Sequence, residues 1–214
     1  MKLDLKELLV GTPTRLRYVV RFSTCHKVHP ENVAEHSYYV ALYSMWLYDW
    51  VCANSELEDY ISLEELLRGA LLHDLEEAST GDVNRLFKYS TPGLADAMHQ
   101  AAREQFRTML IKLFPSSDAR TFTQIKGDQD TWDDCKNAQY WTGRILRFAD
   151  FLSVLSYMMQ ELTNANITMR QHWTTMYAYA AEFDAPIYDF LRPLVNDARL
   201  LMEEAFYQAQ GSRQ

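Results

Sequence analysis

Apolar residues recur at helical spacing along most of the chain. Val33, Val40 and Leu47 mark one face of a helix that we expect from Pro30, which suits a first helical turn, to about Val51. Glycine and proline, the residues that interrupt helices, number only 7 and 6 among 214 residues. No internal repeat or low-complexity tract divides the pattern. The sequence therefore predicts an all-α fold, a helical bundle.

Signals at the ends of the other apolar stretches place further helices. Ser62 followed by Glu65 has the spacing of a capping box, and the helix that it opens should stop near Gly81. Between the helices we expect an irregular stretch from Arg15 to His29 and a short connection from Asp82 to Gly93. The remaining predicted helices run over about Asp4 to Leu9, Leu94 to Leu113, Tyr140 to Asn164, Ile167 to Phe183 and Pro186 to Gln208.

The segment from Pro115 to Asn137 is polar, and four aspartates lie close together at its centre. Acidic clusters can bind a cation, but the spacing here does not follow the EF-hand loop pattern. We therefore expect a solvated surface loop in this part of the chain.

Composition and charge restrict the class of protein. With 48% hydrophobic and 23% charged residues, the chain fits one globular domain over residues 1–214 and excludes a disordered or collagen-like protein. The 21 Lys and Arg against 29 Asp and Glu give a formal net charge of −8, the wrong sign for a surface that wraps a nucleic acid polymer. No apolar run is long enough for a membrane span or a signal peptide, so we expect a cytoplasmic protein with no membrane partner.

The cysteines and aromatic residues point to structural roles. Cys25, Cys52 and Cys135 are an odd number without Cys-x-x-Cys spacing, so we expect free thiols. The potential ligands in residues 25–29 are crowded and lack a distant fourth partner, which argues against a metal site there. We assign the Tyr, Trp and Met residues that lie between positions 38 and 50 and between 157 and 179 to the core and an oligomer interface.

Four ionisable residues occupy apolar positions, where burying a charge or an imidazole is energetically unfavourable. His36 follows Val33 by three residues and so points into the apolar face of its helix, and Asp150 lies within a similar apolar stretch. His73 and Asp74 close the run Gly-Ala-Leu-Leu-His-Asp. A carboxylate buried without a partner costs several kcal/mol, and one divalent cation would satisfy all four residues. Two imidazoles and two carboxylates suit a transition metal such as Mn²⁺, Co²⁺, Ni²⁺ or Zn²⁺.

The order of these residues resembles the HD superfamily of metal-dependent phosphohydrolases, and more narrowly its bacterial 5′-deoxynucleotidase branch. The resemblance covers about residues 17–166. The motifs that carry it are Arg21-Phe22, Glu31-Asn32-Val33-Ala34-Glu35-His36-Ser37, His73-Asp74-Leu75-Glu76-Glu77, Thr80-Gly81-Asp82 with Lys88, Ala149-Asp150-Phe151-Leu152, and Glu161-Leu162 with Asn166.

This resemblance implies that His36, His73, Asp74 and Asp150 bind one divalent metal per chain, and that the protein is a homo-oligomer, a dimer or larger. Two neutral imidazoles and two carboxylates carry a charge of −2, which such an ion cancels, so separate cations must hold an anionic substrate. Arg21 is the first candidate, because it precedes His36 by the fifteen residues that the family spacing requires.

Further residues are expected to act on the substrate. Lys88 is a second candidate for the phosphate. Glu77 follows Asp74 by three residues and could orient or deprotonate the attacking water, whereas Asp82 could protonate the leaving oxygen or fix the water. Phe22 stands where the branch carries Trp beside the sugar, and an aromatic face there would favour 2′-deoxyribose, although it could equally fill the core.

Two departures from the branch affect the expected phosphate site, one by removing a permanent charge and the other by adding one. His29 stands where a second Arg is usual, and Arg85 adds a cation where the branch tends to carry small residues or Pro. Arg85 suggests a longer phosphate chain, as in bacteriophage relatives that hydrolyse dNTPs, notably dATP, and release triphosphate.

The sequence predicts a metal-dependent phosphohydrolase of small deoxynucleotides. The preferred reaction converts a deoxynucleoside 5′-monophosphate and water to a deoxynucleoside and phosphate. The alternatives are a dNTP triphosphohydrolase, a non-catalytic nucleotide-binding regulatory protein on the same scaffold, and a two-iron oxygenase. The last would need further histidine ligands, and His99 and His172 lack a motif context.

Overall fold

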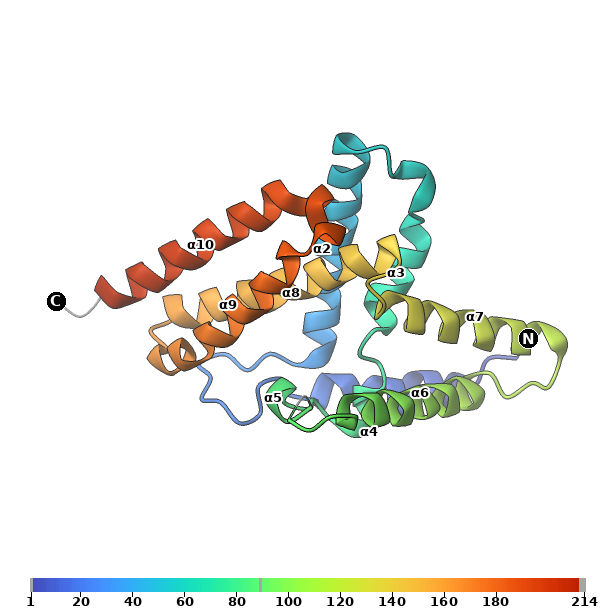
Figure 1. The fold of residues 1–214 in the computed structure, drawn as a ribbon. Coiled ribbons are helices and arrows are strands. Elements are labelled where there is room, and N and C mark those ends of the chain that lie inside the picture. The colour runs from blue at the N-terminus through green and yellow to red at the C-terminus, as the bar shows by residue number, and fades with distance from the viewer. Residues whose placement is uncertain (1, 89, 212–214) are drawn as a thin grey trace.

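The computed structural model describes residues 2–88 and 90–211 (Figure 1). These residues form helices and connecting turns, with one isolated antiparallel bridge between Val20 and Asn32. The all-α prediction is therefore confirmed. The elements are α1 (Leu5–Val10), η1 (Thr12–Tyr18), α2 (Val33–Asn54), η2 (Glu58–Tyr60), α3 (Leu63–Leu72), α4 (Glu77–Thr80), α5 (Arg85–Lys88), α6 (Leu94–Leu113), α7 (Ala119–Cys135), α8 (Trp141–Thr163), η3 (Ile167–His172), α9 (Trp173–Ala181), η4 (Glu182–Asp184), η5 (Pro186–Leu191) and α10 (Arg192–Gly211).

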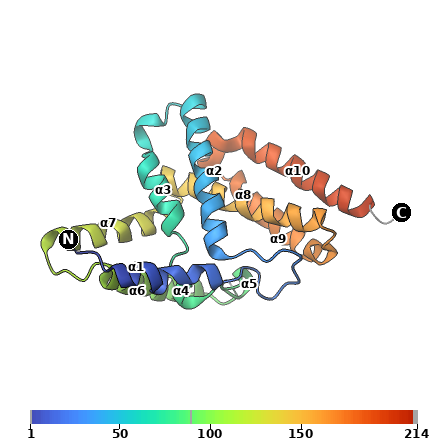
Figure 2. The same cartoon turned by 180° about the vertical axis from the view of Figure 1, so that it is seen from behind.

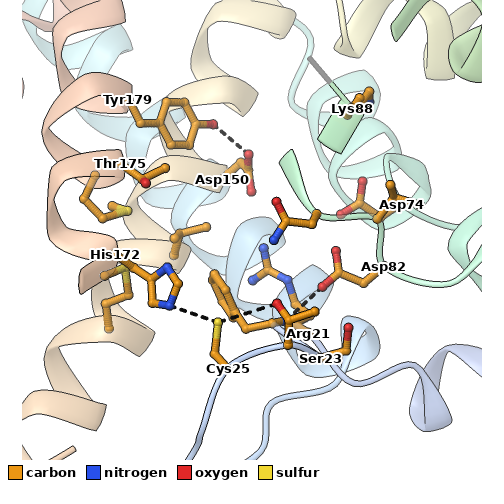
Figure 3. A pocket seen from close by; sticks show the side chains of 17 residues that line it. Arg21, Ser23, Cys25, Asp74, Asp82, Lys88, Asp150, His172, Thr175 and Tyr179 are labelled. Atoms are coloured by element: carbon orange, nitrogen blue, oxygen red, sulfur yellow. Dashed lines mark hydrogen bonds between the residues drawn. The ribbon is translucent and has the colours of Figure 1, made fainter. Parts of the chain in front are cut away.

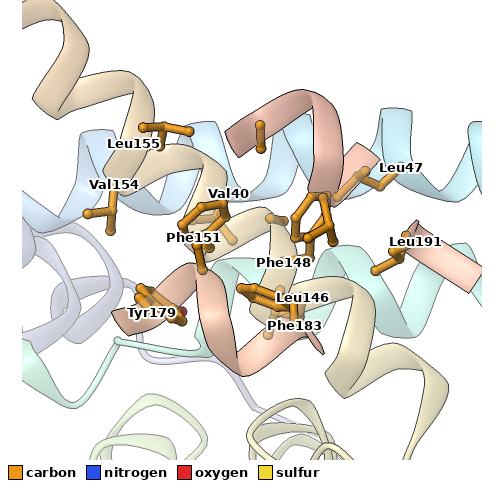
Figure 4. Packing of buried hydrophobic residues seen from close by; sticks show 14 of the residues in the cluster. Val40, Leu47, Leu146, Phe148, Phe151, Val154, Leu155, Tyr179, Phe183 and Leu191 are labelled. Atoms are coloured by element: carbon orange, nitrogen blue, oxygen red, sulfur yellow. The ribbon is translucent and has the colours of Figure 1, made fainter. Parts of the chain in front are cut away.

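Helix α2 crosses α8 at the centre of the molecule, and α3 packs against both (Figure 1). α1 and α6 lie side by side beneath these helices, and the view from behind shows the same layer (Figure 2). The main core lies between α2, α8 and the C-terminal helices, where Phe148, Phe151 and Phe183 are at most 1% exposed (Figure 4). Within the described part of the chain, no helix is both long and apolar enough to span a membrane.

Helix α2 begins later than the sequence predicts. Its N-cap is Asn32, whose side chain accepts a hydrogen bond from Glu35 N, while the Glu35 side chain accepts one from Asn32 N. This reciprocal capping box fixes the helix start, and Pro30 lies outside the helix. At Ser62 the side chain does accept a hydrogen bond from Glu65 N, as expected of an N-cap.

The polar segment between Pro115 and Asn137 is not a loop but contains helix α7, so that prediction was wrong. Asp118 caps the helix by accepting a hydrogen bond from Thr121 N. Ile125 and Trp132 are buried, and they are spaced by two helical turns on one face. Asp128 lies on that face too and pairs with Arg68 at 2.7 Å. The aspartates thus obscured an amphipathic pattern.

The helix that opens at Ser62 ends earlier than predicted. α3 stops at Leu72, residues 73–76 form a turn, and α4 resumes the helix for four residues before Gly81. Gly81 has a φ of 75°, a conformation that glycine adopts without steric cost. His73 and Asp74 therefore lie on a turn at the end of α3 and not within a continuous helix. The chain also forms short helices in two stretches expected to be irregular, η1 and α5.

Candidate metal centre and substrate cavity

The four predicted metal ligands meet at one point, where α2, α8 and the turn after α3 come together. Asp150 Oδ1 lies 3.1 Å from His36 Nε2. Asp74 Oδ2 lies 3.1 Å from His73 Nε2 and 3.7 Å from His36 Nε2. His36, His73 and Asp74 each offer a ligand atom within 4.8 Å of the others. Residues that are distant in sequence thus present two imidazoles and two carboxylates to a common point.

The imidazole nitrogens that face this point have no hydrogen-bond partner. His36 is fully buried and His73 is 6% exposed, and the Nε2 atoms of both are buried and unpaired among the described residues. His73 Nδ1 donates to the Ala70 carbonyl at 2.7 Å, so the Nε2 of the neutral ring keeps its lone pair. Lone pairs that face carboxylate oxygens repel one another unless a cation lies between them. The arrangement therefore fits a divalent metal.

Neighbouring side chains hold His36 in place. Its Nδ1 lies 3.0 Å from the Ser153 hydroxyl and 2.7 Å from Arg21 Nη1. Ser153 follows Asp150 by three residues on α8, so it occupies the same helix face as that ligand. Asp150 is itself held from α9, because Tyr179 donates a hydrogen bond to its Oδ2 at 2.7 Å (Figure 3). Tyr179 thus supports the site, whereas the sequence assigned it only to the core or an interface.

Helix α7 holds the turn that carries the other two ligands. Glu76 is 6% exposed and accepts hydrogen bonds from Trp132 Nε1 at 3.0 Å and from Lys136 Nζ at 2.7 Å. The Lys136 ammonium also lies 4.0 Å from the centre of the Trp132 ring. Glu76 follows Asp74 by two residues, so this buried ion pair fixes the turn beside the metal ligands.

The charges of the ligands are coupled. Burial alone would raise the pKa of Asp74, but the adjacent His73 lowers it well below its ordinary range. Burial lowers the pKa of His36 to about 4, and Arg21 contributes in the same direction. Burial would likewise lower the pKa of His73, yet the Asp74 carboxylate raises it above its ordinary value. Asp74 is therefore ionised and His36 neutral at pH 7, as metal binding requires, and although burial would raise the pKa of Asp150, His36 lowers it in the same way. A metal bound at His73 would replace the ring proton that Asp74 favours.

A cavity of about 240 Å³ opens beside these ligands and is lined by Asp74 and Asp150 (Figure 3). Its volume lies just below the range of about 300–1,000 Å³ that is typical of small-ligand sites. Such a volume favours one small molecule over a polymer. The predicted substrate residues Arg21, Phe22, Asp82 and Lys88 also line this cavity. Arg85 begins α5, but its side chain lies outside the part of the structure that is described.

Arg21 is a buried cation held between the metal centre and a carboxylate. Its side chain is 12% exposed, and Nη1 donates to Glu31 Oε2 at 2.9 Å. Burial alone would lower the pKa of Arg21, but Glu31 and, to a smaller extent, Asp150 and Asp74 raise it. Glu31 belongs to one of the family motifs, but nothing in the sequence indicates that it pairs with Arg21. Arg21 therefore stays charged at the edge of the cavity.

Phe22 is locked in an unusual conformation at the cavity wall. Its φ of 51° is in the left-handed region, which is rare for a residue with a large side chain. The backbone N–H of Phe22 donates to Asp82 Oδ2 at 2.9 Å, and its ring stacks on Tyr157 with centroids 5.5 Å apart. Strain of this kind persists only where the surroundings enforce it. Asp82 thus fixes Phe22, a contact that the sequence did not predict.

Glu77 lies near Asp74, Asp82 and Arg21, whose charges all act on it. Burial raises the pKa of Glu77 to about 10, and the carboxylates of Asp74 and Asp82 add to the effect. Burial and these carboxylates thus favour the protonated form of Glu77, which is not among the residues that line the cavity. Since α3 and α4 are separate helices, Glu77 does not share one continuous helix with His73 and Asp74, although the sequence predicted a helix up to Gly81.

The segment that follows Phe22 is held by α8. Glu161 is 1% exposed and accepts hydrogen bonds at 2.7 Å from the backbone N–H groups of both Val28 and His29. Asn166 donates to Glu161 at 2.6 Å and to the His26 carbonyl at 2.9 Å. The backbone of His29 thus contributes to this anchor, whereas its side chain does not line the cavity. The sequence pattern predicted no anchoring role for Glu161, which appears there only as part of a family motif.

Comparisons with known proteins agree on one family and one fold. Residues 9–196 match the family described as 5′-deoxynucleotidase YfbR-like. A 5′-deoxynucleotidase from Photorhabdus temperata is 26% identical over 154 residues, which span 72% of this chain and 73% of that protein.

Solved structures show the same architecture. An HD-domain phosphohydrolase from Listeria innocua superposes with a TM-score of 0.68 at 18% identity, over 96% of this chain and 98% of that one. The cyanophage S-2L HD phosphohydrolase DatZ, solved with dA and one catalytic Zn²⁺ ion, gives a TM-score of 0.53 at 15% identity, over 93% and 96%. The predicted HD-domain helical fold is therefore confirmed.

Proposed function

Because the chain belongs to the 5′-deoxynucleotidase YfbR-like family, we propose that it hydrolyses deoxynucleoside 5′-monophosphates to deoxynucleosides and inorganic phosphate. The observation that carries this proposal is the meeting of His36, His73, Asp74 and Asp150 beside a cavity that Arg21 also lines. A divalent ion held there would polarise a phosphoryl oxygen and acidify water, which supplies a nucleophile at neutral pH.

Arg21 would bind the phosphate by exchanging partners. It can only donate hydrogen bonds, and in this structure it lies 2.7 Å from His36 Nδ1. Were a metal held at Nε2, the His36 ring proton would be on Nδ1 and donated to Ser153 Oγ, and Arg21 would have no acceptor on the ring. The guanidinium becomes available to an oxyanion in the cavity, and Lys88 lines the same cavity as a second cation.

Two carboxyl groups would divide the proton transfers. Burial and its acidic neighbours raise the pKa of Glu77 to about 10 and favour its protonated form, so we assign it to the protonation of the departing 5′-oxygen. Asp82 lines the cavity and accepts the Phe22 N–H through Oδ2, so we assign it to orienting the attacking water. Pairs of carboxyls in unlike environments are typical of acid–base sites.

A nucleotide panel tests this function. Purified protein is incubated with Mn²⁺ or Co²⁺ and with dAMP, AMP or dATP, and free phosphate and triphosphate are measured separately. We expect phosphate from dAMP and much less from AMP. Triphosphate released from dATP without action on dAMP would replace the proposal with a dNTP triphosphohydrolase. Nucleotide binding without product under any divalent metal would favour a non-catalytic regulatory protein.

A further inference from the structure

The end of the cavity away from Asp74 has a different chemistry. There α8 supplies the apolar side chains of Val154 and Met158, and α9 supplies Thr175 and Met176. His172 ends η3, and Cys25 comes from the segment before α2. Figure 3 shows His172 and Thr175 on the opposite side of the cavity from Asp74 and Lys88. The mechanism described above uses none of these residues.

Cys25 and His172 form a hydrogen-bonded pair across this end. Cys25 Sγ lies 3.0 Å from His172 Nε2, and the side-chain nitrogen of Gln171 lies 3.1 Å from the same atom. With the Cys25 thiol as the donor, His172 Nε2 is the acceptor and the ring proton is on Nδ1, a tautomer with which the orientation of the Gln171 amide agrees. Burial lowers the pKa of His172, which keeps the ring neutral at pH 7.

Two hydrogen-bonding groups at this end of the cavity, His172 Nδ1 and the Thr175 hydroxyl, are available to a ligand. Among the described residues nothing accepts a hydrogen bond from His172 Nδ1, and nothing bonds to the Thr175 hydroxyl. Thr175 follows His172 by three residues, so both side chains lie on one side of the helical segment. A ligand at this end therefore meets one N–H donor and one hydroxyl that can donate or accept.

The walls around these groups suit a flat aromatic ring. Methionine thioethers adapt to aromatic surfaces, and Met158 and Met176 flank this end of the cavity. The Phe22 ring also lines the cavity, and it stacks on Tyr157. A ring with polar atoms on its edge and apolar faces is the chemistry of a nucleobase.

We propose that Cys25, His172 and Thr175 form a nucleobase subsite, in which His172 Nδ1–H donates to an acceptor on the edge of the base and the Cys25 thiol fixes the His172 tautomer. This inference rests on the proposed function, because the phosphate must lie between Arg21 and the metal ligands for the base to reach this end. His172 and Thr175 are binding residues, and Cys25 is a positioning residue.

The test compares deoxynucleotides with 2-deoxyribose 5-phosphate, which has the same sugar and phosphate but no base. His172→Phe keeps the ring volume and removes both nitrogens, and Thr175→Val removes only the hydroxyl. We expect each variant to raise KM for one or more deoxynucleoside monophosphates about tenfold, the equivalent of one hydrogen bond. The change in kcat should be less than twofold, and KM for 2-deoxyribose 5-phosphate should not move.

Two further variants complete the design. Cys25→Ala should raise KM for the same nucleotides by a smaller factor and weaken the preference among bases. His26→Phe is the matched control, because His26 is exposed and does not line the cavity, and it should leave every KM unchanged. An equal rise in KM for 2-deoxyribose 5-phosphate, or no change for any nucleotide, would overturn the subsite.

Failure of the proposed function gives a different result. If the unaltered protein released no phosphate from any nucleotide, calorimetric binding of dAMP and 2-deoxyribose 5-phosphate would replace turnover. Tighter binding of dAMP that His172→Phe abolishes would support the subsite even then. Equal binding of the two ligands by the unaltered protein would refute it.

Discussion

The Nε2 atoms of His36 and His73 have no hydrogen-bond partner among the described side chains, and a cation between them would supply one. Both atoms are buried and unpartnered, and carboxylate oxygens lie 3.1 Å from each. A buried polar atom without a partner costs about 1–3 kcal/mol. The cluster therefore costs stability in the absence of a cation, as expected of a functional site.

Asp74→Asn tests at a single residue whether a metal is bound at this cluster. The substitution keeps the shape of the side chain but removes the carboxylate charge next to both imidazoles, so we expect loss of the metal and loss of turnover together. Metal content after dialysis and phosphate release from dAMP are the two measurements. Asp96→Asn, at an exposed position on α6, is the control and should change neither. An Asp74→Asn protein that kept both metal and activity would contradict the ligand assignment.

The division of roles between Glu77 and Asp82 predicts a dependence on the leaving group. Glu77→Gln cannot give up a proton, so kcat for dAMP should fall by about 10²–10⁴. With p-nitrophenyl phosphate, whose leaving group needs no proton, the fall should be at least tenfold smaller. Asp82→Asn should slow both substrates alike. Equal losses of Glu77→Gln on the two substrates would rule out Glu77 as the acid.

Among the elements, α8 carries the most connections within the site. It supplies the ligand Asp150, the His36 partner Ser153, and Glu161, which anchors the segment after Phe22. Burial alone would raise the pKa of Glu161, but hydrogen bonds from Val28, Asn166 and His29 lower it below its ordinary value of 4.5. The ionised form of Glu161 is thus the form that holds the segment.

This anchor predicts a pH-dependent stability. Because the folded pKa of Glu161 is lowered, its contribution is complete above the ordinary value of 4.5 and is lost as the pH falls through the folded pKa. Glu161→Gln should lower the free energy of unfolding at pH 7 by about 1–3 kcal/mol and flatten its decline in acid. Urea unfolding between pH 3 and 7 measures both, and an unchanged acid profile would show that Glu161 is not the anchor.

The elements also show where sequence reasoning succeeds. The bounds of α6 agree with the prediction, because Gly93 and Pro115 bracket an amphipathic stretch. α7 was missed because its aspartates suggested a loop, although Ile125 and Trp132 repeat at helical spacing. The break after Leu72 has no glycine or proline to mark it, so only the packed structure shows that His73 and Asp74 lie on a turn.

For the site, ionisable residues on apolar faces predicted His36, His73, Asp74 and Asp150 as ligands of one cation, and the order of these residues resembled a known family. The residues that support the site could not be predicted from the sequence, for a physical reason. Tyr179 and the Cys25–His172 pair act through contacts between distant segments, and no local pattern encodes such contacts. Glu31 lies only ten residues from Arg21, but the segment between them is irregular and has no periodicity that would pair them.

For the whole molecule, a net charge of −8 means that the protein as a whole repels a phosphate. Attraction must come from the few cations in the cavity, chiefly Arg21 and Lys88. Helices from distant parts of the sequence converge to place these cations beside the ligands. Metal binding therefore requires the folded state and should stabilise it.

Thermal unfolding measures how much metal binding stabilises the folded protein. A metal that binds only the folded protein adds about 2.7 kcal/mol to the free energy of unfolding at one hundred times its Kd. Added Mn²⁺ should thus raise the Tm of the metal-stripped protein by several degrees and leave the Tm of Asp74→Asn unchanged. An equal rise for both proteins would place the ion elsewhere on the acidic surface.

Phosphate release from dAMP by metal-stripped protein, titrated with Mn²⁺ or Co²⁺, is the most direct test of the central claim. We predict that the stripped protein is inactive and that activity rises with added metal until one ion is bound per chain. Absence of phosphate at every concentration of either metal, from protein that is folded and binds the ion, would contradict the assignment of this cavity as a 5′-deoxynucleotidase active site.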